Sequence, residues 1–87
     1  MKTKIQPAAK PELAEEHILR SADPAEARLR LSGAHVWAIV GYWRAVDRDA
    51  GAVARDYGIP LEAVRAALAY YEQHKAVIDA RLAANAA

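Results

Sequence analysis

The sequence contains no cysteine and carries almost no net charge. Without cysteine, the chain can be neither a disulfide-linked scaffold nor a thiol enzyme. Its 12 Lys and Arg residues nearly balance its 11 Asp and Glu residues, which gives a formal net charge of +1 at pH 7. The chain therefore lacks the excess positive charge that is typical of a protein binding polyanions nonspecifically.

Long hydrophobic runs are also missing. Charged side chains are spread over the first twenty residues and leave no room for the apolar region of a signal peptide. The longest strongly apolar stretch, Val36–Tyr42, is far shorter than a membrane span. We therefore expect a cytoplasmic protein with no membrane association.

The apolar fraction of 54% overstates the core, because 22 of the 87 residues are alanine. Alanine buries little surface but is the best helix former, so the composition predicts short helices packed around a thin core. Single cores in domains of roughly this size rarely supply more than about 3–5 kcal/mol. We therefore expect a homo-oligomer or a protein partner to add stability.

The chain divides into an arm and one domain. Residues 1–16 are polar and contain Pro7 and Pro11, which predicts a flexible N-terminal arm. Residues 17–87 form the predicted domain, which opens with a short β-ribbon over 17–33 because Leu29 and Leu31 alternate with arginines.

From residue 35 onward the apolar spacing is helical, which predicts an all-α class with helices at about 35–46, 49–57 and 60–84. Asp49 is a suitable N-cap and Gly58 a suitable end for the second helix. The third segment has heptad-like spacing from Leu61 to Leu82 without proline or glycine. It predicts a long C-terminal helix whose second half extends beyond the domain and presents Ile78 and Leu82 to a partner.

Ala54, Gly58 and Val64 have the spacing of a helix-turn-helix unit. Such a unit needs a small residue where the helices nearly touch, a glycine in the turn and a buried aliphatic residue in the second helix. Ile59 supplies the hydrophobic turn position. The sequence therefore predicts a three-helix bundle containing this motif.

DNA binding by this unit requires several copies, because its predicted reading face is poor. The outward positions of the second helix include one arginine, one glutamate and three alanines: Glu62, Ala63, Arg65, Ala66 and Ala69. Such a face offers one side chain, the arginine, that can form paired hydrogen bonds with guanine, and it has no row of basic residues to contact phosphates. As a multimer, we expect the chain to contact DNA through Arg28, Arg30, Arg55, Glu62 and Arg65.

Six large aromatic side chains exceed what one small helical core can bury, and the excess predicts interface anchors. Together with the C-terminal helix they give the expected partner-binding residues: Trp37, Tyr42, Tyr70, Ile78, Arg81 and Leu82. The three histidines are far apart in sequence and no catalytic constellation is present. We therefore expect no metal, no cofactor and no enzymatic activity.

The order of these pieces over about residues 17–82 resembles a prokaryotic family with a homeodomain-like fold. The most specific matches are Arg28-x-x-Leu31-x-Gly33, Val36-Trp37-x-Ile39-Val40, Ala54-x-x-Tyr57-Gly58-Ile59 and Val64-x-x-Ala67-Leu68-x-Tyr70-Tyr71. This family, formerly a domain of unknown function, is associated with VapB-type antitoxins paired with PIN-like ribonuclease toxins.

The resemblance implies an antitoxin that multimerises, inhibits a cognate PIN-like toxin and binds its own operator DNA. Because a PIN-like site is acidic and binds metal, an inserted cation from Arg81, Lys2 or Lys4 is one inhibitory mechanism that it suggests. The alternative is a stand-alone helix-turn-helix transcriptional regulator with no toxin partner.

Overall fold

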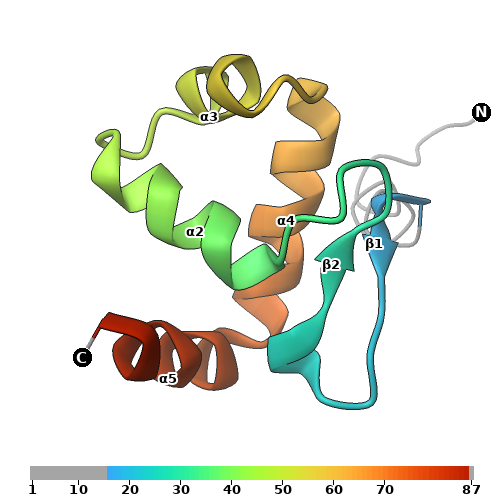
Figure 1. Ribbon diagram of the computed structural model, residues 1–87, viewed down its shortest axis with the longest axis vertical. Coiled ribbons are helices and arrows are strands. Elements are labelled where there is room, and N and C mark those ends of the chain that lie inside the picture. Colours follow the sequence, from blue (N-terminus) through green and yellow to red (C-terminus); the bar gives the residue numbers. More distant parts are fainter. Residues whose placement is uncertain (1–15, 87) are drawn as a thin grey trace, which may run out of the picture.

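The computed structural model describes residues 16–86. Apart from residue 16, the predicted N-terminal arm with Lys2 and Lys4 lies outside the described residues. The described chain is mostly helical, with one short antiparallel ribbon at its N-terminal end (Figure 1). No helix within it has both the length and the apolarity needed to cross a membrane.

The predicted ribbon is present as β1 (Ile18–Leu19) and β2 (Arg28–Leu29), with Ile18 opposite Leu29. The 3-10 helix η1 (Pro24–Glu26) connects the strands. Asp23 begins η1, because its side chain accepts a hydrogen bond from the Ala25 N–H at 3.0 Å. A two-stranded ribbon is marginal alone in water, and here the inward side chains of Ile18 and Leu29 join the helical core.

Helices α2 (Val36–Ala45) and α3 (Ala50–Tyr57) lie close to their predicted positions. In α2, apolar residues recur at the predicted helical spacing, and two of them, Ile39 and Val40, are fully buried. Asp49 is the N-cap of α3 and accepts a hydrogen bond from the Ala52 N–H at 3.1 Å. The predicted N-cap of α3 and the predicted burial of Ile39 and Val40 in α2 are therefore confirmed.

A tight turn joins α3 to α4 (Leu61–Gln73). Gly58 has a φ of 66°, in the left-handed region that glycine adopts without steric cost, and its N–H donates to the carbonyls at the end of α3. Ile59 is buried directly after it, and α4 follows Pro60.

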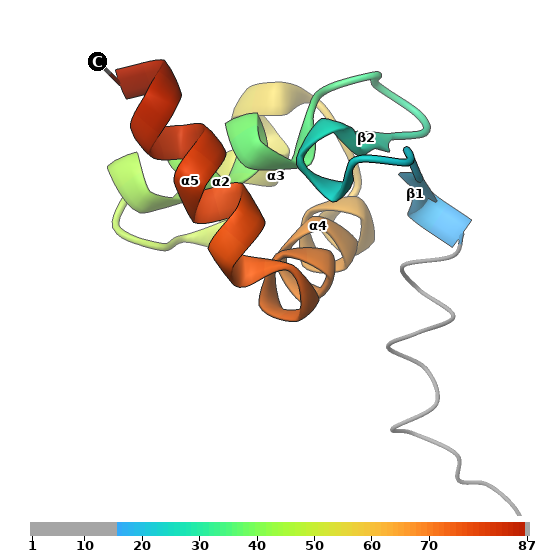
Figure 2. The same cartoon turned by 90° about the horizontal axis from the view of Figure 1, so that it is seen from below.

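The predicted single helix over 60–84 is wrong. It is interrupted at His74, and α5 (Lys75–Ala86) folds back across α2 instead of continuing α4 (Figures 1 and 2). The physical reason is burial: in this position Ile78 is 0% exposed, whereas a straight helix would carry it away from α2. The segment that was expected to extend beyond the domain is part of its core.

Candidate functional site

The predicted DNA-facing side of α4 is only partly exposed. Glu62 and Arg65 lie on the surface, but Ala63 and Ala66 are 1% and 0% exposed. Placing these two alanines on the outward face was wrong, because α4 packs against α2, α3, α5 and β1 and so has a wide buried arc. The polar reading surface of α4 is reduced to Glu62, Arg65 and their exposed neighbours.

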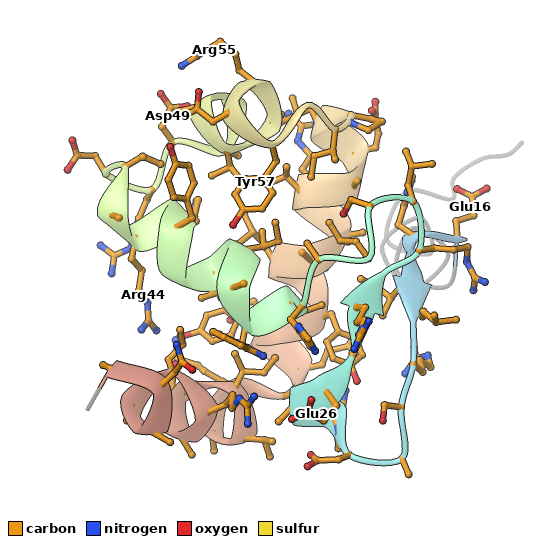
Figure 3. The ribbon with its side chains drawn as sticks, viewed as in Figure 1. Glu16, Glu26, Arg44, Asp49, Arg55 and Tyr57 are labelled. Carbon is orange, nitrogen blue, oxygen red and sulfur yellow. The ribbon has the colours of Figure 1, made fainter. Side chains whose placement is uncertain are left out.

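The other predicted DNA contacts lie on different elements. Arg55 is exposed on α3 and points away from the body of the protein, 3.9 Å from Asp56 (Figure 3). Arg28 lies in β2, and Arg30 is the first residue after this strand. The guanidinium of Arg30 donates to the backbone carbonyls of residues 16 and 18 at 3.3 and 3.4 Å, so this arginine also fastens the ribbon.

Two of the predicted partner anchors are buried within the protein's own fold. Tyr70 is 2% exposed and Ile78 is 0% exposed. Tyr70 packs against His74, with ring centroids 4.3 Å apart, and the guanidinium of Arg20 lies over the Tyr70 ring, 5.5 Å from its centroid. Burial also raises the pKa of the Tyr70 hydroxyl. Neither side chain has surface to offer a partner in this conformation.

Trp37 and Arg81 cover each other where α2 meets α5. The Arg81 guanidinium lies 5.0 Å from the Trp37 ring centroid and forms an ion pair with Glu26 at 3.4 Å. The Trp37 Nε1 and the Arg81 Nε are buried without a hydrogen-bond partner among the described residues. Both residues remain half-buried, so part of each is still accessible.

Tyr42 and Leu82 are also half-buried and are used within the fold. The Tyr42 hydroxyl donates to Asp56 at 2.5 Å, which raises the pKa of that hydroxyl, and its ring packs edge-on against Tyr57. Leu82 packs directly over Gly41 of α2: a Cβ at position 41 would lie 3.0 Å from its Cδ2. Glycine at 41 therefore allows α5 to approach α2 closely.

A polar cluster, here called the clasp, joins α2, α4 and α5. It consists of Arg44, Tyr71, Lys75 and Asp79. The hydroxyl of the buried Tyr71 donates to Asp79 Oδ1 at 2.7 Å and accepts hydrogen bonds from Arg44 at 2.5 Å and from Lys75 at 3.2 Å. Arg44 also reaches Asp79 Oδ1 at 2.8 Å. The Tyr71 hydroxyl therefore forms hydrogen bonds with three charged side chains and links α5 to α2 (Figure 3 shows Arg44 above α5).

The clasp predicts a pH-dependent stability. The hydrogen bond from Tyr71, followed by the one from Arg44, lowers the pKa of Asp79 below its ordinary value of 3.8. A carboxylate with a lowered folded-state pKa stabilises the fold above its unfolded pKa, and that stabilisation disappears as the pH falls through the folded pKa. Wild type should therefore be more stable than Asp79→Asn at pH 7, and the difference should shrink below about pH 4.

Urea unfolding of both proteins between pH 2.5 and 7 measures this difference. Glu62→Gln, at an exposed carboxylate outside the clasp, is the control and should show no such convergence. A wild-type to Asp79→Asn difference that stays constant with pH would contradict the role given to Asp79.

An apolar groove that the sequence did not predict lies beside the clasp. It has a volume of about 460 Å³ and is lined by Trp43, Arg65, Leu68, Ala69, Tyr71, Glu72 and Gln73. Trp43 follows Ile39 and Val40 at helical spacing, and Leu68 lies within the heptad-like segment between Leu61 and Leu82, so the spacing predicts that both are buried. Both are half-buried, because the C-terminal parts of α2 and α4 leave a gap that no other described element fills.

Among residues 16–86, no three His, Asp or Glu side chains are grouped so that they could hold a metal ion. A comparison with protein-family models finds no matching family, and comparisons with curated proteins and with solved structures find no significant match.

Proposed function

We propose that this protein is the antitoxin of a type II toxin–antitoxin system. In this proposal it is a non-enzymatic module that binds and inhibits a PIN-like ribonuclease toxin. It also regulates its own operon by binding operator DNA as a multimer, through a homeodomain-like helix-turn-helix formed by α3 and α4.

The antitoxin part of the proposal rests on the sequence resemblance over residues 17–82, and the observation that supports its DNA-binding part is the geometry of the α3–α4 connection. Gly58 is left-handed, its N–H donates to the carbonyls of Ala54 and Arg55, and Ile59 and Val64 are buried on either side of the start of α4. These are the features that a helix-turn-helix requires at those positions. They support the motif, and Glu62 and Arg65 supply polar groups on the exposed side of its second helix.

Charge supports binding by a multimer over binding by a single copy. Arg55 and Arg65 lie near the predicted DNA face, but Asp56 and Glu62 are their neighbours in sequence. Phosphate contacts dominate affinity for DNA, and a neutral surface makes few of them. Several copies would add the arginines of separate domains along one operator.

The protein-binding part of the proposal is supported by the groove beside the clasp. Its lining is mainly apolar and includes Trp43, a residue type enriched among energetic anchors of protein interfaces. An apolar groove suits a protein segment better than it suits a phosphate backbone. The alternative function, a regulator without a toxin, would leave this groove with no assigned partner.

The gene next to this one tests the choice between the two functions. Co-expression with that gene's product should give a stable complex and should relieve the growth arrest caused by the product alone. Trp43→Ala should weaken the complex, whereas Tyr57→Ala, an exposed aromatic outside the groove, should not. A neighbour that causes no growth arrest and forms no complex at micromolar concentration would favour the stand-alone regulator.

DNA binding has a separate test. If Arg65 contacts a base edge, Arg65→Ala should weaken binding to the chain's own upstream DNA by about 1–3 kcal/mol, measured by fluorescence anisotropy at fixed salt. Arg48→Ala, which removes the same charge from an exposed loop position, is the matched control. Equal losses for both variants would mean that Arg65 contributes charge only.

A further inference from the structure

The joint between α4 and α5 is a single residue. α4 ends at Gln73, α5 begins at Lys75, and His74 between them has φ −133° and ψ 37°, away from helical values near −63° and −42°. The His74 N–H still donates to the carbonyls of Tyr70 and Tyr71, at 3.1 and 3.0 Å. The chain therefore leaves the helical path at this one residue and re-enters a helix immediately.

Nothing in the local sequence demands this break. Residues 61–86 contain neither proline nor glycine, and the residues flanking His74 include good helix formers such as Gln73 and Lys75. The spacing of apolar residues along α4 also continues through α5. Local preference favours one continuous helix, so the bend is maintained by tertiary contacts of α5.

Those tertiary contacts lie mainly on α2 and η1, and α4 adds the hydrogen bond from the Tyr71 hydroxyl to Asp79. Ile78 is buried against the core, Leu82 packs over Gly41, Asp79 pairs with Arg44 at 2.8 Å, and Arg81 reaches η1. None of them depends on which chain supplies α5. A second copy of this protein can therefore provide the same side chains to the same positions.

We propose that two copies of the chain exchange α5: His74 becomes helical, residues 61–86 form one straight helix in each copy, and each α5 packs on the α2 of the other copy. The straight helix would be about 39 Å long at 1.5 Å per residue. Exchange keeps the α5 contacts and restores the backbone hydrogen bonds that the bend interrupts. Dimers of this kind are favoured where a hinge is short and its bent form is not locally preferred.

This inference does not depend on the proposed antitoxin function. It explains how a neutral domain with a thin core could form a homodimer without a separate apolar interface. It also places two α3–α4 units in one particle, related by a two-fold axis.

Two variants of the hinge residue His74 test the proposal, because exchange predicts that their dimers differ in stability. His74→Ala and His74→Gly both remove the imidazole that packs on Tyr70, so they differ only in backbone preference. Glycine is less favourable than alanine inside a helix, and a dimer contains two hinges. The dimer of His74→Gly should therefore have a dissociation constant about 30-fold higher than that of His74→Ala. Sedimentation equilibrium over a concentration series measures both constants. Equal constants, or monomers for wild type and both variants at every concentration, would overturn the proposal.

A disulfide test identifies which chain supplies α5. Because the wild type has no cysteine, Gly41→Cys and Leu82→Cys can be introduced into separate chains, and the two proteins unfolded, mixed and refolded together. Exchange predicts an oxidised heterodimer with a 41–82 disulfide, seen as a covalent dimer on a non-reducing gel and confirmed by mass spectrometry. As a control, both cysteines are also placed in one chain. Exchange would be overturned if this double variant closes the 41–82 disulfide within one chain while the two single-cysteine proteins form a non-covalent dimer without a disulfide between chains. Circular dichroism establishes that each variant folds, and the His74 pair decides the question if either cysteine variant does not.

Discussion

Replacing Ile78 with alanine is expected to lower the free energy of unfolding by about 2–5 kcal/mol, the range for truncating a buried isoleucine or leucine. Ile78 is 0% exposed and is the only residue of α5 that is fully buried among the described residues. Its removal leaves a cavity where α5 meets α2. Because single cores in domains of roughly this size rarely supply more than about 3–5 kcal/mol, this change would unfold much of the population.

Val77→Ala provides the matched control for this prediction. Val77 is the preceding residue on the same helix, but it is 41% exposed. Its truncation should change the free energy of unfolding by no more than about 0.5 kcal/mol. Urea unfolding followed by circular dichroism measures both variants. Similar small effects for Val77 and Ile78 would mean that α5 is not docked on the core.

Removing the hydroxyl of Tyr71 is expected to cost about 1–2 kcal/mol, because it leaves charged partners in the clasp without their shared hydrogen-bonding group. Tyr71 is 2% exposed, and its hydroxyl contacts Arg44, Lys75 and Asp79. The Arg44–Asp79 ion pair remains in Tyr71→Phe, but both partners are substantially exposed and such pairs contribute little alone.

The neighbouring Tyr70 is the control for the hydroxyl. It is equally buried, but it has no hydrogen bond among the described contacts, so Tyr70→Phe should be close to neutral. Thermal unfolding of the two variants against wild type gives the comparison. If Tyr70→Phe is as destabilising as Tyr71→Phe, the clasp does not hold α5 through the Tyr71 hydroxyl.

The parts of the fold that were predictable from sequence are those determined locally. Asp49 and Gly58 bound α3 because a capping carboxylate and a left-handed glycine act over a few residues. The apolar spacing in α2 identified Ile39 and Val40 as buried. The ribbon followed from the alternation around Leu29, which is buried as that alternation predicts. Leu31, the other leucine of the alternation, lies beyond the end of β2 and is 70% exposed, so the pattern overestimated the length of the ribbon.

The bend at His74 was not predictable in this way, because no residue near it breaks a helix. It depends on the fit of Ile78 and Leu82 against α2, which are contacts between residues more than thirty positions apart in sequence. The same distant packing buried Ala63 and Ala66 on the side of α4 that was expected to face DNA. The groove at Trp43 was missed for the related reason that a periodic pattern identifies a helix face but not whether another element covers it.

The two tryptophans on α2 make the protein its own spectroscopic reporter. Trp37 lies beneath Arg81 of α5, whereas Trp43 lies in the wall of the groove with Arg48 over its ring. A cation stacked on an indole alters its fluorescence, so the emission of each tryptophan depends on a different neighbour. With Trp43 replaced by phenylalanine, the remaining emission would follow the release and return of α5 in real time. With Trp37 replaced instead, it would follow occupancy of the groove, and the two events could be timed separately in the same chain.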